Sequence, residues 1–188
     1  MLRITAGEHR GRKLRVPAVA STRPLPERAR QGLMNHLRAL IPEAVIWDVY
    51  AGSGILGFEA LSRGAARVVA VERHRAAAAQ LRASAAELGY ADRHEVAQVD
   101  VRSFLDQAPR QPPNLLFYDP PYAAFRGSGR PETWELFCAL AARLAPGGCA
   151  VVHAPKGLLA PHERAQLSGL EERVYGSSSL YWWHKGEE

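Results

Sequence analysis

The chain has 188 residues, of which 47% are hydrophobic and 23% charged, and its formal net charge at pH 7 is +5. This length and composition fit one domain with a substantial core and exclude a disordered chain. No apolar run approaches the roughly 20 residues needed to span a bilayer, and residues 1–4 lack the apolar centre of a secretory signal, so we expect a cytoplasmic protein without membrane contact.

Positive charge is concentrated at the amino end of the chain. Residues 1–38 hold nine Arg or Lys and two Glu, a net charge of +7, which leaves −2 for the remainder. This asymmetry is typical of a nucleic-acid-binding extension on a nearly neutral enzyme. A solvated, charged terminus is the simpler alternative.

The amino-terminal segment predicts three short elements. Residues 2–16 alternate apolar and polar residues around a turn, which predicts a β-hairpin with a basic face. Proline-rich residues 17–26 should form an extended connection. Residues 27–40 have helical spacing, with Arg28 and Arg30 off the apolar stripe.

From residue 42 onward, apolar runs and helical stretches alternate, so we divide the chain into an extension, 1–41, and a main domain, 42–188. Alternation of this kind predicts an α/β, doubly wound, Rossmann-like fold whose sheet is mostly parallel. A carboxyl-terminal hairpin should add two antiparallel strands, giving seven. We expect strands at residues 44–47, 67–72, 94–100, 114–118 and 149–154, helices at 55–61, 74–88, 103–107 and 131–144, and the hairpin at 170–184.

A glycine turn follows the first strand of this domain. Asp48-Val49-Tyr50-Ala51-Gly52-Ser53-Gly54 connects that strand to a helix whose first N–H groups are free to meet a ligand. Asp48 adds an acceptor, which favours a cationic or hydroxyl-rich nucleoside over a bare pyrophosphate. The turn also satisfies the dinucleotide fingerprint, and Glu72 follows at about the distance expected of a ribose-binding acid. An NAD-dependent oxidoreductase is therefore an alternative.

Each of the first four strands ends in an acid, and these acids should gather at one edge of the sheet. Glu72 offers two oxygens to the two hydroxyls of a ribose. Asp100, or the backbone of Val101, would meet an adenine amino group. The two cysteines have no metal-ligand spacing, so no metal is expected. The residues expected to bind the cofactor are Asp48, Tyr50, Gly52, Ser53, Gly54, Glu72, Asp100 and Val101.

Asp119-Pro120-Pro121-Tyr122 follows the fourth strand directly. The Asp119 carboxylate and the Pro120 carbonyl can each accept one N–H of a planar amine, which aims the nitrogen lone pair at a methyl donor. Tyr122 offers an aromatic face for the target base. We expect Asp119, Pro120 and Tyr122 to form the catalytic site. This motif resembles the D/N-P-P-Y/F signature of amino-group methyltransferases, and the glycine turn resembles the cofactor loop of class I S-adenosylmethionine-dependent methyltransferases.

Further segments add to these two motifs: Ile4-Thr5-Ala6-Gly7, Gly11-Arg12-Lys13-Leu14, Thr22-Arg23-Pro24, Glu59 to Ala65 and Tyr175-Gly176, beside DVYAGSG and DPPY. With them the chain as a whole resembles the RsmD family of bacterial 16S ribosomal RNA guanine-N2 methyltransferases. This resemblance implies a class I methyltransferase fold, S-adenosylmethionine as methyl donor and S-adenosylhomocysteine as product. The implied partner is 16S ribosomal RNA within the small subunit or an assembly intermediate, and we expect a monomer. The residues expected to contact RNA are Arg10, Arg12, Lys13, Arg23 and Arg28.

The chain departs from the family pattern at three places. Leu25-Pro26-Glu27 replaces a segment such as Thr-Thr-Asp, Gly32 stands where a better helix former is usual, and His153 occupies a strand end where an acid is common. DPPY would serve a nucleic-acid adenine-N6 methyltransferase equally well, so that activity is the nearest alternative. A non-catalytic RNA-binding assembly factor is another.

Overall fold

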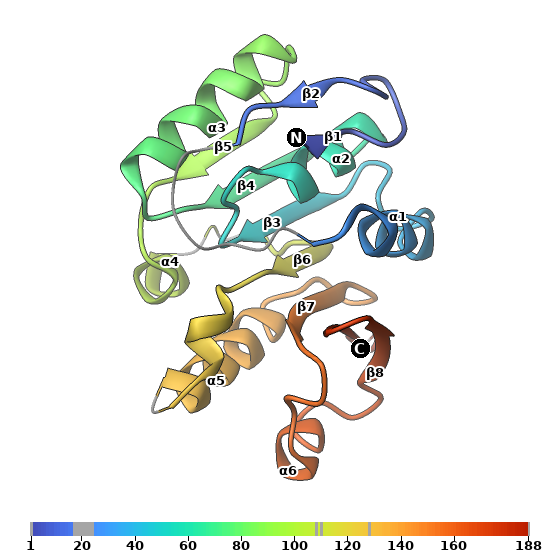
Figure 1. Ribbon diagram of the computed structural model, residues 1–188, viewed down its shortest axis with the longest axis vertical. Helices are drawn as coiled ribbons and strands as arrows, with labels where there is room; N and C mark the ends of the chain where they lie inside the picture. Colours follow the sequence, from blue (N-terminus) through green and yellow to red (C-terminus); the bar gives the residue numbers. More distant parts are fainter. Residues whose placement is uncertain (1, 17–24, 108, 110, 128, 188) are drawn as a thin grey trace.

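A computed structural model describes residues 2–16, 25–107, 109, 111–127 and 129–187. In these residues a seven-stranded sheet crosses the molecule and helices cover both of its faces (Figure 1). No helix of the described segments is long and apolar enough to cross a membrane. The strands of the sheet are β3 (Val45–Val49), β4 (Arg67–Val71), β5 (His94–Ala97), β6 (Leu115–Tyr118), β7 (Cys149–Pro155), β8 (Glu171–Tyr175) and β9 (Ser178–His184).

The strand order is β5-β4-β3-β6-β7-β9-β8. Strands β3 to β7 are parallel, and β8 and β9 form an antiparallel hairpin against β7. The predicted α/β fold, with its mostly parallel seven-stranded sheet and carboxyl-terminal hairpin, is confirmed. The chain order reverses between β3 and β6, and the carboxyl ends of strands at such a reversal are where doubly wound sheets bind ligands.

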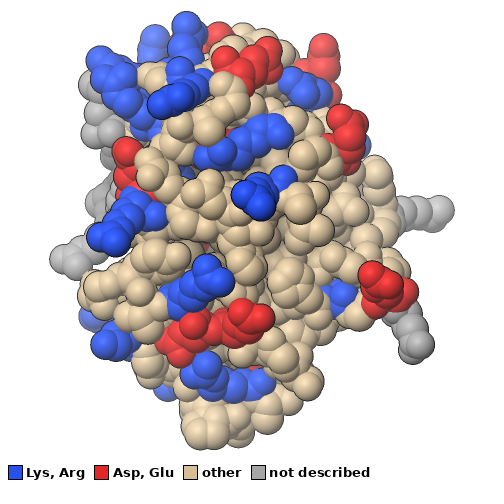
Figure 2. All heavy atoms as spheres, turned by 90° about the vertical axis from the view of Figure 1, so that its right-hand side faces the viewer, with Lys and Arg blue, Asp and Glu red and all other residues tan. Residues whose placement is uncertain are grey.

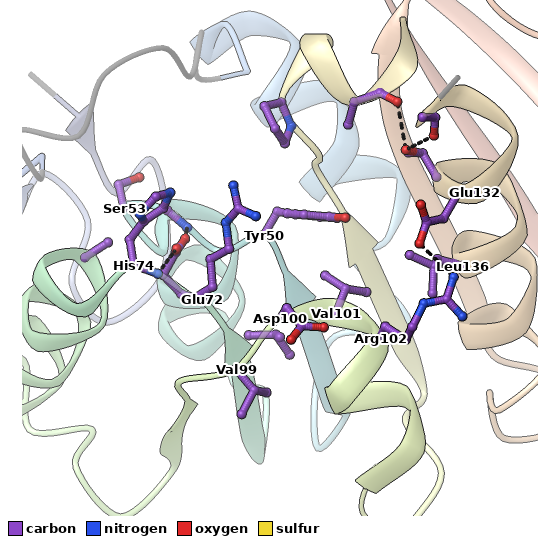
Figure 3. A pocket seen from close by; sticks show the side chains of 18 of the residues that line it. Tyr50, Ser53, Glu72, His74, Val99, Asp100, Val101, Arg102, Glu132 and Leu136 are labelled. Carbon is purple, nitrogen blue, oxygen red and sulfur yellow. Dashed lines mark hydrogen bonds and ion pairs between the residues drawn. The ribbon is translucent and has the colours of Figure 1, made fainter. Parts of the chain in front are cut away.

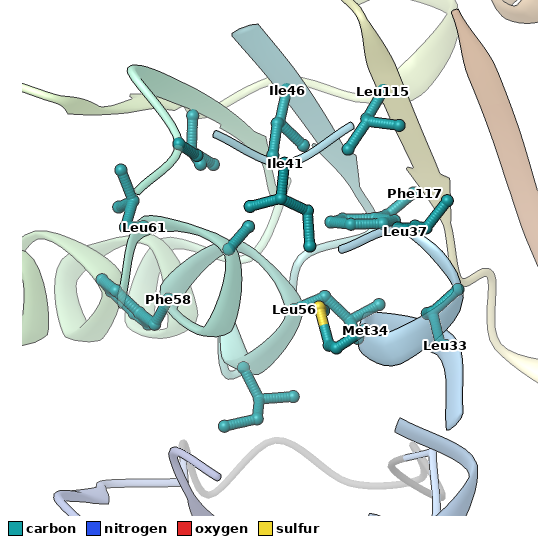
Figure 4. Packing of buried hydrophobic residues seen from close by; sticks show 14 of the residues in the cluster. Leu33, Met34, Leu37, Ile41, Ile46, Leu56, Phe58, Leu61, Leu115 and Phe117 are labelled. Atoms are coloured by element: carbon teal, nitrogen blue, oxygen red, sulfur yellow. The ribbon is translucent and has the colours of Figure 1, made fainter. Parts of the chain in front are cut away.

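Five helices pack on the sheet, and each face has its own core. One face is covered by α1 (Glu27–His36), α2 (Ile55–Ser62) and α3 (Arg75–Glu87). Apolar residues of α1 and α2 lie close to those of β3 and β6 in Figure 4. The other face is covered by α4 (Val101–Gln107) and α5 (Gly129–Ala141). Two short elements were not predicted from the sequence: η1 (Tyr122–Phe125) and α6 (Pro161–Arg164).

The predicted amino-terminal hairpin is present, with short strands β1 (Leu2–Arg3) and β2 (Lys13–Leu14) paired antiparallel. Ile4 and Leu14 of the hairpin are buried in the same core as α1 and α2. The predicted connection at residues 17–26 lies mostly outside the described residues. Helix α1 ends at His36, earlier than expected, and residues 37–40 form turns.

Arg30 corrects one expectation, because it is 1% exposed rather than on an outer face of α1. Its Nε donates to Glu59 of α2 at 3.1 Å, and its Nη2 donates to the carbonyl of Arg3 at 2.9 Å. Glu59 is fully buried and also accepts hydrogen bonds from the backbone N–H (2.9 Å) and hydroxyl (3.0 Å) of Thr5. A buried charge requires such partners. Glu59 therefore fastens both the hairpin and α1 to α2.

Candidate functional site

A cavity of about 490 Å³ opens at the carboxyl ends of β3, β4 and β5 (Figure 3). Its volume lies in the range of small-molecule sites, roughly 300–1,000 Å³. The loops after β3 and β6 both border it, through Gly52 and Pro121. The members of the predicted cofactor site that line it are Tyr50, Gly52, Ser53, Glu72, Asp100 and Val101.

The loop after β3 has a strained backbone. Tyr50 has a positive φ of 63°, which is uncommon for a residue other than glycine. Its ring meets that of Tyr118 edge to face, with centroids 5.3 Å apart. Gly54 is buried and precedes α2 with φ 72°, and a Cβ there would lie 2.4 Å from Leu81 Cδ2. Only glycine satisfies both the backbone and the packing at this position.

Asp48 lies beneath this loop rather than in the cavity. It is 1% exposed, and its Oδ2 accepts a hydrogen bond from the backbone N–H of Gly57 in α2 at 3.0 Å. The described residues that line the cavity do not include Asp48. Burial raises the pKa of its carboxyl to about 7. The hydrogen bond between Asp48 and Gly57 therefore orients α2. A direct contact between Asp48 and a cofactor stays a prediction.

Glu72 follows β4 and faces the loop after β3. Its Oε2 accepts from the backbone N–H of Gly52 at 3.0 Å, and its Oε1 accepts from the backbone N–H of His74 at 2.8 Å. Each carboxylate oxygen has a second lone pair available to a ligand. Two neighbouring hydroxyls could be bound here, as predicted for a ribose.

Asp100 and Val101 line the far side of the cavity, after β5. The carboxylate of Asp100 accepts from the backbone N–H of Ser103 at 2.9 Å and from its hydroxyl at 2.8 Å. These hydrogen bonds lower the pKa of Asp100. Asp100 therefore caps the start of α4, and a contact with an adenine amino group stays a prediction.

Helix α5 contributes a wall that the sequence did not indicate. Glu132 and Leu136 line the cavity, and Glu132 accepts from Arg102 of α4 at 2.7 Å. In Figure 3 these two charged side chains point toward each other across the gap between α4 and α5. No motif in residues 131–144 distinguishes this cavity wall from an ordinary amphipathic helix.

Asp119 begins the loop after β6, and its backbone N–H donates to the carbonyl of Val49 at 3.1 Å. Asp119 borders a separate small hollow together with His153, and it is not among the described residues that line the main cavity. The carbonyl of Pro120 accepts no hydrogen bond from the described residues, whereas that of Pro121 accepts from Ala124. Pro120 is buried, and acceptance of a substrate N–H by its carbonyl stays a prediction.

His153, at the end of β7, joins the predicted catalytic residues. Its Nδ1 lies 2.7 Å from Asp119 Oδ1, and its Nε2 lies 3.2 Å from the hydroxyl of Tyr122. That hydroxyl also lies 2.6 Å from Ser178 Oγ. The sequence feature that could have identified His153 is its position near the carboxyl end of β7, the strand next to β6, which DPPY follows.

Three predicted RNA-contact residues form what we call the basic turn, namely Arg10, Arg12 and Lys13, all exposed on the hairpin. Arg28 is exposed on α1, and Arg23 lies outside the described residues. In Figure 2, Lys and Arg side chains gather over the upper part of the face shown, at the height of the hairpin in Figure 1. Leu2 and Val16, at the two ends of the hairpin, line the cavity.

A family model described as Conserved hypothetical protein 95 matches residues 2–184. The chain is 43% identical over 121 residues to ribosomal RNA small subunit methyltransferase D of Escherichia coli K12, which covers 64% of this chain and 60% of that relative. The chain thus matches about 60% of that relative's length.

Two solved structures share the fold. A hypothetical protein of Thermus thermophilus has a TM-score of 0.79 and 33% identity, over 97% of this chain and 99% of that one. An RNA methyltransferase of Salinibacter ruber in complex with S-adenosyl-L-homocysteine has a TM-score of 0.59 and 23% identity, over 88% of this chain and 95% of that one. The RsmD resemblance expected from the sequence is confirmed, and the chain belongs to this family, described as Conserved hypothetical protein 95.

Proposed function

We propose that this protein transfers a methyl group from S-adenosylmethionine to N2 of a guanine in small-subunit (16S) ribosomal RNA, within the small subunit or an assembly intermediate. The observation that carries the proposal is that the loops after β3 and β6 border one cavity, with Asp119 at the start of the second loop. The name of the Escherichia coli relative supports the same substrate class.

The residues around the cavity fit S-adenosylmethionine. Glu72 would accept the hydroxyls of its ribose, since both oxygens are already oriented by backbone N–H groups. Val71, Val99 and Val101 give the cavity apolar walls suited to an adenine ring. The cavity lining includes three carboxylates, of Glu72, Asp100 and Glu132, and two guanidinium groups, of Arg73 and Arg102. When bound, the donor would supply a methyl group on a positively charged sulfur.

The loop after β6 would hold the guanine. Asp119 Oδ2 and the Pro120 carbonyl would each accept one N–H of the exocyclic amine, and the ring of Tyr122 would stack on the base. A bound methyl donor would supply its methyl carbon to this nitrogen as the carbon–sulfur bond breaks, with S-adenosylhomocysteine as the product. Asp119 would accept the proton that departs from the nitrogen. Catalysis is mainly positioning and stabilisation of charge.

The extension, residues 1–41, would dock the RNA. Phosphate contacts fix the register of a nucleic acid on a protein without reading its sequence, and exposed Arg and Lys suit that role. The basic turn lies on the same hairpin whose ends line the cavity. RNA bound to this turn would extend along the hairpin to reach the cavity, which the two ends of the hairpin line.

The test uses small subunits that lack the methyl group, the purified protein and S-adenosylmethionine, followed by mass analysis of nucleosides. We expect N2-methylguanosine, and N6-methyladenosine would favour the adenine alternative. Asp119→Ala should lower methyl transfer by about 10²-fold or more while donor affinity, measured by calorimetry, falls less. RNA binding without methylation would favour an assembly factor, and binding of NAD without S-adenosylmethionine would favour an oxidoreductase.

A further inference from the structure

A chain of hydrogen bonds lies behind Asp119. It runs from Asp119 Oδ1 to His153 Nδ1 (2.7 Å), from His153 Nε2 to the hydroxyl of Tyr122 (3.2 Å), and from that hydroxyl to Ser178 Oγ (2.6 Å). The four side chains come from the end of β6, from β7, from η1 and from β9. Segments far apart in sequence thus converge on one carboxylate.

The partners of the imidazole fix its orientation. His153 is 3% exposed, so its ring nitrogens depend on these side chains for hydrogen bonds. A carboxylate can only accept, so the nitrogen that faces Asp119 carries a hydrogen. In the neutral ring the other nitrogen accepts from Tyr122, and the hydroxyl of Ser178 donates to the Tyr122 oxygen. Both ring nitrogens are satisfied in this arrangement.

The consequence for Asp119 is that its two oxygens differ. Oδ1 is occupied by His153, whereas Oδ2 has no hydrogen-bond partner among the described residues. The Asp119 side chain is 25% exposed, so one carboxylate edge is accessible while the other is fixed. Without the hydrogen bond to His153, the Asp119 carboxylate could rotate about its terminal side-chain bond, because that torsion is broad.

We propose that His153 is a positioning residue that holds Asp119 by one oxygen and so presents the other to the amine that is methylated. The inference rests on the proposed function. His153 does not touch the reacting atoms, and it acts through the direction of the Asp119 lone pairs. The loss of such positioning costs up to about 10²-fold in rate.

Two substitutions separate this role from simple packing. Asparagine at position 153 places an amide N–H close to where Nδ1–H lies, so His153→Asn keeps a donor for Asp119. His153→Leu removes it. We expect His153→Leu to lower kcat by roughly 10- to 100-fold at unchanged affinity for S-adenosylmethionine, and His153→Asn to recover most of that loss. His184 is exposed at the opposite end of β9 from Ser178 and provides the control His184→Leu, which should keep the wild-type rate.

Thermal unfolding and donor affinity are measured for every variant. If His153→Leu does not fold, His153→Gln replaces it, since the longer amide reaches toward Tyr122 rather than Asp119 and should behave as the leucine variant would. The inference is overturned if His153→Leu has the wild-type kcat, or if the asparagine and leucine variants lose kcat equally. Inactive Asp119→Ala with fully active His153→Leu would reject this inference alone, whereas a wild-type protein that forms no N2-methylguanosine would reject the proposed function and this inference with it.

Discussion

Replacing Asp48 by asparagine should stabilise the protein, and the effect should grow as the pH rises. Asp48 is 1% exposed, and burial raises the pKa of its carboxyl from 3.8 to about 7. The hydrogen bond from Gly57 opposes this shift, while the negative charges of Asp119 and Glu72 add to it. The folded chain therefore keeps this proton over a pH range in which the unfolded chain has lost it.

The size of the effect follows from the two pKa values. Between them unfolding releases a proton, so the free energy of unfolding falls by about 1.4 kcal/mol for each pH unit. From about pH 5 to about pH 8 the ionisation of Asp48 should lower the free energy of unfolding of the wild type by about 3 kcal/mol, nearly all of it below pH 7. Asparagine cannot ionise, and its side-chain oxygen can still accept from Gly57, so Asp48→Asn should lack this loss.

Urea-induced unfolding, followed by far-UV circular dichroism at both pH values, measures the difference between variant and wild type. We expect that difference to increase by about 3 kcal/mol from the lower to the higher pH. Asp92→Asn is the matched control, because Asp92 is exposed to water in the folded chain. A difference for Asp48→Asn that stayed constant with pH would refute the reasoning, since Asp48 would then be ionised in the folded protein.

His94 should act in the opposite direction, because burial lowers its pKa from 6.5 to about 4. The free energy of unfolding of the wild type should fall by about 2 kcal/mol from about pH 7 to about pH 5, and that of His94→Leu should not show this fall in the same urea measurements. Equal decreases in the two proteins would contradict this. Gly32→Ala should lower the thermal midpoint, because a Cβ at position 32 would lie 2.6 Å from the hydroxyl of Tyr175. This clash should outweigh the helix propensity of alanine, which is about 1 kcal/mol more favourable than that of glycine. In a Tyr175→Phe background the same change should be neutral or stabilising, and stabilisation by Gly32→Ala alone would reject the packing argument. Alanine at all three positions of the basic turn should weaken RNA binding and reduce the slope of log affinity against log salt by about 2. The exposed Arg143, beyond α5, provides the control Arg143→Ala, and an unchanged slope in the triple variant would reject the docking surface.

The parallel part of the sheet was predictable because largely apolar runs, such as those of β3 and β6, alternate with helical stretches. The glycine turn between β3 and α2 and the acids at the ends of β4 and β5 also placed the cavity at the correct edge. What the sequence did not indicate is the direction of each carboxylate. Asp48 turns under its loop to meet Gly57, and Asp100 turns back to Ser103. These directions depend on local backbone hydrogen bonds that alternation of strands and helices does not specify.

The partners of buried charges were the other unpredictable part. Arg30 was expected on the outside of its helix because it lies off the apolar stripe, and its buried partner Glu59 lies 29 residues away in the sequence. His153 meets Asp119 because β6 and β7 are paired, with Tyr118 opposite Val152. Both strands were predicted, but their register was not. A register error of one residue would have turned His153 to the other face.

The position of Glu59 affects how the chain can fold during synthesis. Thr5 leaves the ribosome long before its partner, since 54 residues separate the two in sequence. Until α2 emerges, the hairpin has neither the carboxylate nor the Ser62 carbonyl and hydroxyl to which its backbone groups bond. The first segment to be made is thus completed by a later one, so a nascent chain stalled before residue 59 would carry an unanchored, positively charged end.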